Sequence, residues 1–143
     1  MPHKYFITVL LIFASSVGLL AQDVFGKWKT VDDYTGEAKS IIEIYEDSGK
    51  VYGKIIELIN PKKIDPVCER CSGEDRDQPI VGLQFIRGLE KDGDEYNGGK
   101  ILDPDNGKLY KCYITLEEVD TLKVRGYIGI SLFGRTQYWY RVK

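Results

Sequence analysis

The sequence predicts an all-β fold, a single small antiparallel barrel of about eight strands. Two observations lead to this prediction. Short segments in which apolar and polar residues alternate follow one another along the chain, and residues typical of turns separate them. No long segment keeps the 3.6-residue period of an amphipathic helix. A sheet of this size can close on itself, which removes the unpaired strand edges that promote aggregation.

The first three strands are expected at residues 24–31, 37–46 and 51–59, where β-branched and aromatic residues are frequent. A hairpin is expected between the second and third strands, at 47–50. The sequence there is Asp-Ser-Gly-Lys, in which Gly supplies a positive φ and Asp can bond the nearby backbone. These two strands are therefore predicted to be neighbours in the sheet.

The fourth strand is expected at 83–89, after a long irregular segment at 60–82. Every third residue from Leu83 to Leu89 is apolar, which also fits one face of a helix. Two glycines in and before this segment each lower helix propensity by about 1 kcal/mol relative to alanine. A strand is therefore the preferred prediction, with a helix as the alternative. Loops as long as 60–82 are usually functional or disordered.

The last four strands are expected at 95–102, 108–116, 121–128 and 136–142. The sequence Asp-Pro-Asp-Asn-Gly at 103–107 predicts a second hairpin, with Gly and Asn at positions of positive φ. Alternate residues of these strands should face the core. In the sixth strand the inward set is Tyr110, Cys112, Ile114 and Leu116. In the seventh strand it is Leu122, Val124, Gly126 and Ile128.

The N-terminal residues predict a secretory signal peptide at 1–21. Lys4 precedes a nearly continuous apolar run at 5–20, which ends in small Ala21. The run is shorter than the about 20 apolar residues of a membrane-spanning helix. No Cys follows it, so a lipid-anchored cysteine is not expected. The mature protein is predicted to be one barrel domain, 22–143, located in the periplasm or secreted, with no membrane span after cleavage.

Composition and the position of histidine exclude several function classes. Net charge is −2 and the basic residues are scattered, so nucleic-acid binding is not expected. The only histidine is His3, which lies in the predicted signal peptide. The mature protein should therefore lack Ser-His-Asp and Cys-His catalysis, and zinc sites that use histidine. No catalytic residue, metal or cofactor is assigned.

The loop at 60–82 carries the pair Cys68 and Cys71, and Cys112 is the third cysteine of the chain. In an oxidising compartment such a pair is expected to form a disulfide. Three pairings are possible, and we favour Cys68 with Cys71 because Cys112 falls on the inward face of its strand. A zinc site would need a fourth ligand, and a redox site lacks the thioredoxin-like context.

Several blocks of the sequence resemble domain of unknown function 2147, a family of exported bacterial proteins. The blocks are Gly-Lys-Trp at 26–28, Gly-Lys-Ile at 53–55, Gly-Leu at 82–83, and the longer segments 98–110, 122–129 and 134–141. They cover nearly the whole mature chain. The resemblance implies a fold but no established activity, and it gives no role to the cysteines.

A second resemblance is to the lipocalin-like barrels, whose first strand carries Gly-x-Trp and whose last strand carries an arginine. Gly26, Trp28 and Arg141 stand at the matching positions. The resemblance implies that Trp28 closes the base of the barrel while Arg141 stacks on its ring and donates to nearby carbonyls. The alternative is that Trp28 is an ordinary core aromatic.

Four residues in these blocks form a candidate ligand-binding cluster: Arg125, Arg135, Gln137 and Tyr138. Arginine with aromatic residues can hold an anionic or amphipathic ligand. We prefer the alternative that they are outward cross-strand pairs, each contributing about 0.2–1 kcal/mol. A one-residue error in register would exchange the two faces, so alternation alone does not decide.

Two further motifs are weighed as sites. The hairpin at 103–107 superficially resembles a calcium loop, but Ile114 stands where a bidentate Glu is required, so a plain turn is preferred. Glu43 and Glu57 could form the carboxylate pair of a glycoside hydrolase, although strand glutamates are usually solvated.

Three functions therefore remain, in order of preference. The first is an exported non-catalytic barrel that binds a small apolar or amphipathic ligand. The second is a filled barrel that interacts with another envelope protein. The third is a carboxylate-based hydrolase.

Overall fold

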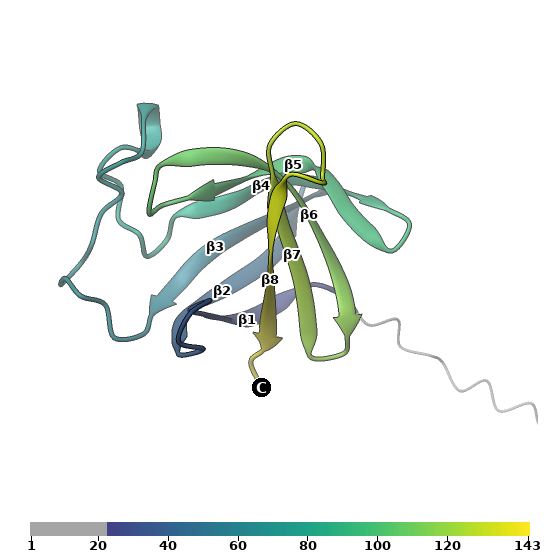
Figure 1. Ribbon diagram of the computed structural model, residues 1–143, viewed down its shortest axis with the longest axis horizontal. Helices are drawn as coiled ribbons and strands as arrows, with labels where there is room; N and C mark the ends of the chain where they lie inside the picture. Colours follow the sequence, from purple (N-terminus) through teal and green to yellow (C-terminus); the bar gives the residue numbers. More distant parts are fainter. Residues whose placement is uncertain (1–22) are drawn as a thin grey trace, which may run out of the picture.

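The computed structural model describes residues 23–143, and the predicted signal peptide at 1–21 lies outside the described residues. The chain forms a closed antiparallel barrel in which neighbouring strands follow sequence order and β1 pairs with β8 (Figure 1). The strands are β1 Gly26–Val31, β2 Ala38–Asp47, β3 Lys50–Leu58, β4 Gln84–Asp92, β5 Glu95–Asp103, β6 Lys108–Glu118, β7 Thr121–Tyr127 and β8 Gly134–Arg141. The prediction of an all-β barrel of eight strands is confirmed. Within residues 23–143, no helix is long and apolar enough to cross a membrane.

The segment with helix-like spacing is strand β4, and a β-bulge explains the spacing. On β3, Val51 pairs with Leu89 and Gly53 pairs with Ile86, so β4 uses one more residue than β3 over this stretch. Gly88, which lies inside the stretch, has a φ of +69°, the conformation that glycine supplies in bulges. The bulge turns Ile86 and Leu89 to the same side of the sheet, where both are fully buried.

Alternating apolar residues of the strands fill the barrel interior. The fully buried side chains include Trp28, Ile42, Ile44, Ile86, Leu89, Ile114 and Leu122. The predicted inward residues Cys112, Ile114, Leu122 and Val124 are buried as expected. Ile128 is a correction, because β7 ends at Tyr127 and the Ile128 side chain is 66% exposed in the following loop.

One end of the barrel is closed around Trp28, whose side chain is completely buried. The Trp28 indole Nε1 donates to the Val24 carbonyl at 2.9 Å, so its polar atom is satisfied. The Arg141 guanidinium lies over the Trp28 ring at 4.3 Å from its centroid. Gly26 lies next to Arg141, and a Cβ at Gly26 would be 3.6 Å from the Arg141 Nη1. The three residues of the lipocalin-like pattern thus meet at this end.

The long connection between β3 and β4 folds over the opposite end, where a disulfide closes a short loop within it and two contacts hold it to the rest of the barrel. Cys68 and Cys71 form a disulfide, as predicted, and both are buried. The Arg87 guanidinium binds Asp75 through two hydrogen bonds of 2.8 and 3.0 Å. The backbone of Arg70 lies against Gly107 so closely that a Cβ at Gly107 would be 1.9 Å from the Arg70 carbonyl oxygen. The connection is therefore a packed part of the structure.

Both predicted hairpins form, with one difference in their turns. Ser48 and Gly49 have positive φ in the first turn, and Gly107 has a φ of +73° in the second. Asn106, for which a positive φ is also expected, does not have one. Its side chain instead accepts from the Lys108 amide and donates to the Tyr110 hydroxyl.

Candidate functional site

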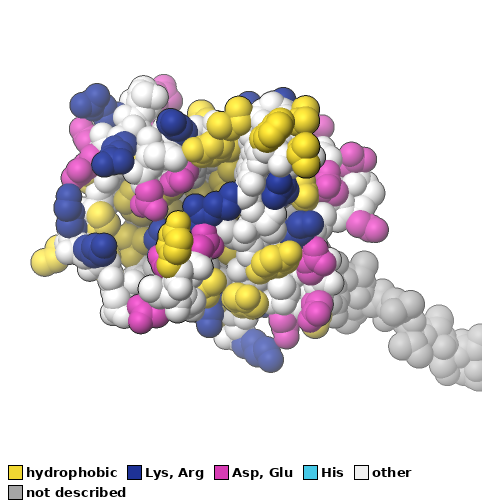
Figure 2. Space-filling view, viewed as in Figure 1, with side chains coloured by type: hydrophobic (Ala, Val, Ile, Leu, Met, Phe, Trp, Pro, Cys, Tyr) yellow, Lys and Arg dark blue, Asp and Glu magenta, His cyan; other side chains and the backbone are white. Residues whose placement is uncertain are grey.

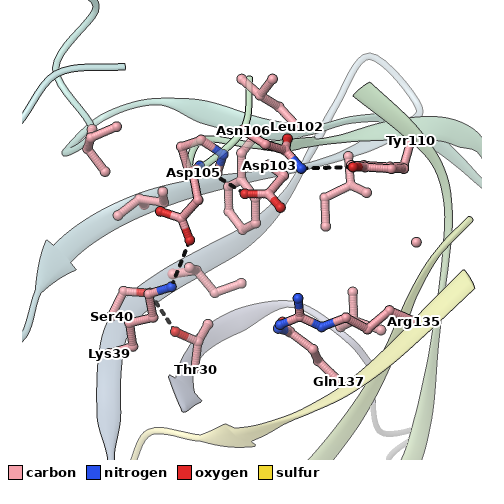
Figure 3. Close-up of a pocket in the computed structure, with 18 of the residues that line it drawn as sticks. Thr30, Lys39, Ser40, Leu102, Asp103, Asp105, Asn106, Tyr110, Arg135 and Gln137 are labelled. Atoms are coloured by element: carbon pink, nitrogen blue, oxygen red, sulfur yellow. Dashed lines mark hydrogen bonds and ion pairs between the residues drawn. The ribbon is translucent and has the colours of Figure 1, made fainter. Parts of the chain in front are cut away.

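A cavity of about 680 Å³ opens at the end of the barrel opposite Trp28 (Figure 3). Its walls come from the halves of the strands nearest that end and from the connections that follow β3, β5 and β7. The volume falls in the range of about 300–1,000 Å³ that is typical of small-molecule sites. The barrel is therefore filled at the Trp28 end and hollow at the other.

The floor of the cavity is apolar. It is lined by Ile42, Ile55, Phe85, Val124 and Trp139, all of which are buried side chains. The rings of Phe85 and Trp139 are in contact, with centroids 5.8 Å apart. Such a surface gains free energy when a ligand covers it, because about 25 cal/mol is gained for each Å² of apolar area removed from water.

Two pairs of polar side chains interrupt the apolar wall. The hydroxyl oxygens of Thr30 and Ser40 are 2.6 Å apart, and both residues are buried (Figure 3). On the opposite wall, the Asn106 amide donates to the Tyr110 hydroxyl at 2.8 Å. Hydroxyl and amide groups can redirect one hydrogen bond toward a ligand, so they favour a ligand that carries some polar atoms.

A chain of hydrogen bonds leads from the floor of the cavity to its mouth. The Trp139 Nε1 donates to the Gln137 Oε1 at 3.1 Å, which fixes the orientation of that amide. The Gln137 Nε2 then donates to the Asp33 Oδ2 at 3.3 Å, and the same carboxylate oxygen accepts from the Arg135 guanidinium. Asp33 lies in the β1–β2 connection, so this carboxylate joins that turn to β8.

Charged residues surround the mouth in ion pairs. Lys39 binds Asp105 across the opening at 3.1 Å, and Lys63 binds Glu69 at the same distance. The Arg135 side chain is 65% exposed and its partner Asp33 is 30% exposed. Exposed pairs of this kind are weak, at about 0–1 kcal/mol, so they can open without a large cost when a ligand enters.

The structure separates the four residues of the predicted cluster. Arg135 and Gln137 line the cavity. Tyr138 points outward from β8 and is 45% exposed. Arg125 lies outside the cavity as well, where its guanidinium donates to the Ser131 carbonyl at 2.8 Å and to the Thr136 hydroxyl at 2.7 Å. Ligand binding by Arg135 and Gln137 remains a prediction.

The two glutamates considered for hydrolysis lie away from the cavity. Glu43 forms an ion pair with Lys54 at 3.5 Å, on the outer side of β2 and β3. Glu57 is exposed, and its strand partner is Ile41. Neither carboxylate therefore lines the cavity.

The third cysteine is inaccessible. Cys112 is a free thiol with an exposed fraction of 1%. Burial raises the pKa of this thiol to about 12, because the thiolate would be poorly solvated in the core. A thiol with so high a pKa is a poor nucleophile at neutral pH.

Comparisons with known proteins agree with this geometry. Residues 26–141 match the model of the family described as uncharacterized protein conserved in bacteria (DUF2147). A solved structure, protein HP1028 from Helicobacter pylori, described as belonging to the lipocalin family, superposes with a TM-score of 0.74 and 21% sequence identity. The match covers 85% of this chain and 84% of that one, and it shows a shared fold. No curated protein matches the sequence.

Proposed function

This chain belongs to the bacterial DUF2147 family, and we propose that it is a non-catalytic barrel that binds a small amphipathic ligand in its open cavity. The observation that carries this proposal is the distribution of polarity within one cavity. The floor is formed by buried apolar side chains, whereas hydroxyl, amide and charged groups lie nearer the mouth. A concave apolar pocket with a few convergent polar groups is the usual form of a small-molecule site.

The same distribution predicts how the ligand is oriented. Its apolar part would cover Phe85 and Trp139 on the floor. Its polar part would lie beside Gln137 and Arg135, where an anionic group could replace Asp33 as the partner of the guanidinium. An anionic end should therefore bind more tightly than a neutral end of the same size.

A substitution at Gly126 can test the cavity without disturbing the strand. Gly126 lines the cavity in β7, and a Cβ there would meet Ile101 and Tyr110 at 3.4 and 3.7 Å, which are ordinary contacts. The variant Gly126→Leu should project its side chain into the space that the ligand needs. The matched control is Tyr138→Leu, which places the same side chain on the outer face of β8.

The measurement is fluorescence titration with an anionic probe, 1-anilinonaphthalene-8-sulfonate, and a neutral one, 1-aminoanthracene. Gly126→Leu should weaken both probes by about tenfold or more, a change of about 1.4 kcal/mol. Arg135→Gln should weaken the anionic probe more than the neutral one, and Tyr138→Leu should change neither. Equal affinities of wild type and Gly126→Leu would show that the probes bind elsewhere and would contradict the proposal.

We also propose that the protein acts outside the cytoplasm. The apolar run at 5–20, which ends at Ala21, supports export, and the Cys68–Cys71 disulfide supports an oxidising compartment. Mass spectrometry of protein recovered from the periplasm or medium of a bacterial host should give the mass of a chain that begins at Gln22. Recovery of the uncleaved chain in the cytoplasm would contradict this proposal.

A further inference from the structure

The β7–β8 loop, residues 128–133, presents apolar side chains to solvent at the rim of the cavity. Ile128, Ile130, Leu132 and Phe133 are between 60% and 74% exposed. Figure 1 shows this loop as a projection above the barrel, and Figure 2 shows hydrophobic side chains gathered over the same region. Other strongly exposed apolar residues, such as Tyr34 and Ile64, stand apart from this group in sequence. Single exposed apolar residues are ordinary, but a group on one projecting loop indicates an interaction site.

The backbone carbonyl groups of this loop are hydrogen-bonded within the protein. Each carbonyl from Gly129 to Phe133 accepts a hydrogen bond from within the protein. Lys111 donates to Gly129, and Arg125 donates to Ser131 and Leu132, at distances between 2.8 and 3.3 Å. The Phe133 amide donates to the Ile130 carbonyl, and the Ile128 amide donates to the Phe133 carbonyl. Unsatisfied carbonyls are costly where water is excluded, and this loop has already satisfied them.

Cationic side chains lie at the base of the loop. Lys100 and Lys111 are directly opposite each other on β5 and β6, and Arg125 lies on β7. Within residues 23–143, none of the three forms an ion pair with a carboxylate. Like charges placed opposite each other destabilise a sheet slightly. An anionic group bound beside Lys100 and Lys111 would relieve this repulsion. The surface therefore combines apolar side chains at the tip of the loop with cationic side chains beneath it.

We propose that the β7–β8 loop docks the barrel on the surface of an anionic lipid bilayer. The apolar side chains of the loop would enter the boundary between headgroups and acyl chains, and Lys100, Lys111 and Arg125 would contact the phosphates. The amides of residues 129–132 have no protein acceptor in the described part of the chain, so they too can donate to phosphate oxygens. This proposal goes beyond ligand binding in the cavity and does not depend on it.

Vesicle sedimentation tests the docking directly. The full chain, as processed by a bacterial host, is mixed with vesicles of phosphatidylglycerol and phosphatidylcholine, or of phosphatidylcholine alone. The wild type should bind the anionic vesicles at least about tenfold more strongly, and high salt should weaken the binding. The double variant Leu132→Ser/Phe133→Ser should lose about tenfold or more. The control Ile64→Ser removes an apolar residue elsewhere that is even more exposed, and it should bind as the wild type does.

A spectroscopic variant separates insertion of this loop from attachment by any other segment. Phe133→Trp should show a shift of tryptophan emission to shorter wavelength with anionic vesicles, and brominated acyl chains should quench it. Ile64→Trp should show neither effect. Because every sample has the same N-terminus, a contribution from residues outside the described part would be equal in all of them.

The opposite results would overturn the proposal. Equal vesicle binding by the wild type and the Leu132→Ser/Phe133→Ser variant would show that the loop does not mediate attachment. A Phe133→Trp emission that vesicles leave unchanged would show that the loop stays in water. If the wild type is dimeric without lipid and the double variant is monomeric, a second copy of the chain covers the loop instead. The cavity is tested separately, by Gly126→Leu and Arg135→Gln, so none of these outcomes decides whether it binds a ligand.

Discussion

Arg141 lies over Trp28 and also ties together three segments at the closed end of the barrel. The guanidinium is 4.3 Å from the ring centroid of Trp28. It donates to the carbonyls of Asp23, Phe25 and Val119 at 2.8, 3.0 and 2.9 Å. The chain preceding β1, the β6–β7 turn and the end of β8 are therefore connected through one side chain, which covers the indole from solvent.

Replacement of Trp28 by Ala should reduce the free energy of unfolding by about 3–5 kcal/mol, because it removes a fully buried aromatic side chain and leaves a cavity. Urea denaturation followed by circular dichroism measures the change. A midpoint close to that of the wild type would show that Trp28 does not support the closed end.

Arg141→Lys tests the guanidinium itself, since it preserves the charge. A lysine ammonium cannot stack as a plane or bond three separated carbonyls in the same way. The expected loss is about 1–3 kcal/mol, in line with hydrogen bonds to charged groups. Thermal denaturation beside the wild type measures it, and Lys62→Arg, at an exposed position, serves as the control. If the two variants melt alike, the contacts of Arg141 contribute little.

Native Cys112 should resist alkylation. Its pKa of about 12 leaves almost no thiolate at pH 8, and its burial denies access to reagents. Modification by iodoacetamide should therefore proceed only as fast as the barrel opens, and it should become rapid in urea. Fast labelling of the folded protein under non-reducing conditions would mean that the core near Cys112 opens locally.

Gly107→Ala should loosen the contact between the β5–β6 turn and the long β3–β4 connection. An added Cβ would overlap the Arg70 carbonyl, and a φ of +73° is itself unfavourable for alanine. Gly36→Ala is the matched control, because Gly36 has a φ of +72° but open space around it. The difference between the two variants should be about 1–3 kcal/mol in unfolding free energy. Equal losses would show that only the backbone strain matters.

The Asp32 carboxyl in the β1–β2 connection should titrate below its ordinary pKa of 3.8. The backbone amides of Thr35 and Tyr34 donate to it, and both bonds favour the ionised form. Its pKa is lower in the folded protein than in the unfolded one. The stabilisation is therefore fully present above the unfolded pKa and is lost as the pH falls through the folded pKa. An NMR titration of the carboxyl carbon measures this, and a midpoint at or above 3.8 would contradict it.

Local patterns were sufficient to predict the strands but not the cavity. Alternation in β6 and β7 identified the inward side chains up to Gly126, and it failed at Ile128 because the strand ends one residue earlier. In β8, Arg135, Gln137 and Trp139 share one parity and Tyr138 has the other, so a correct register would have separated them. The partnership of Asp33 with Gln137 joins residues far apart in sequence and follows only from barrel closure.

The β4 bulge shows a second reason why pattern analysis is limited. An extra residue in one strand interrupts the alternation of inward and outward side chains. Ile86 and Leu89 both face inward although they are three residues apart, which is also the spacing of a helix. The site residues of the floor carried no chemical signal beyond being apolar. In the sequence, Ile55 and Phe85 are indistinguishable from residues that only fill the core. Whether such a residue lines a cavity depends on how much of the interior the side chains of the other strands fill.

The chain has two tryptophans, and their positions allow intrinsic fluorescence to report binding in the cavity. Trp28 is sealed at the closed end beneath Arg141, so its emission should be constant while the barrel stays folded. Trp139 lies on the cavity floor with its indole nitrogen bonded to Gln137, so an arriving molecule would change its surroundings. A change in intrinsic fluorescence on adding a compound would therefore report cavity occupancy directly, and extracts could be screened without any label.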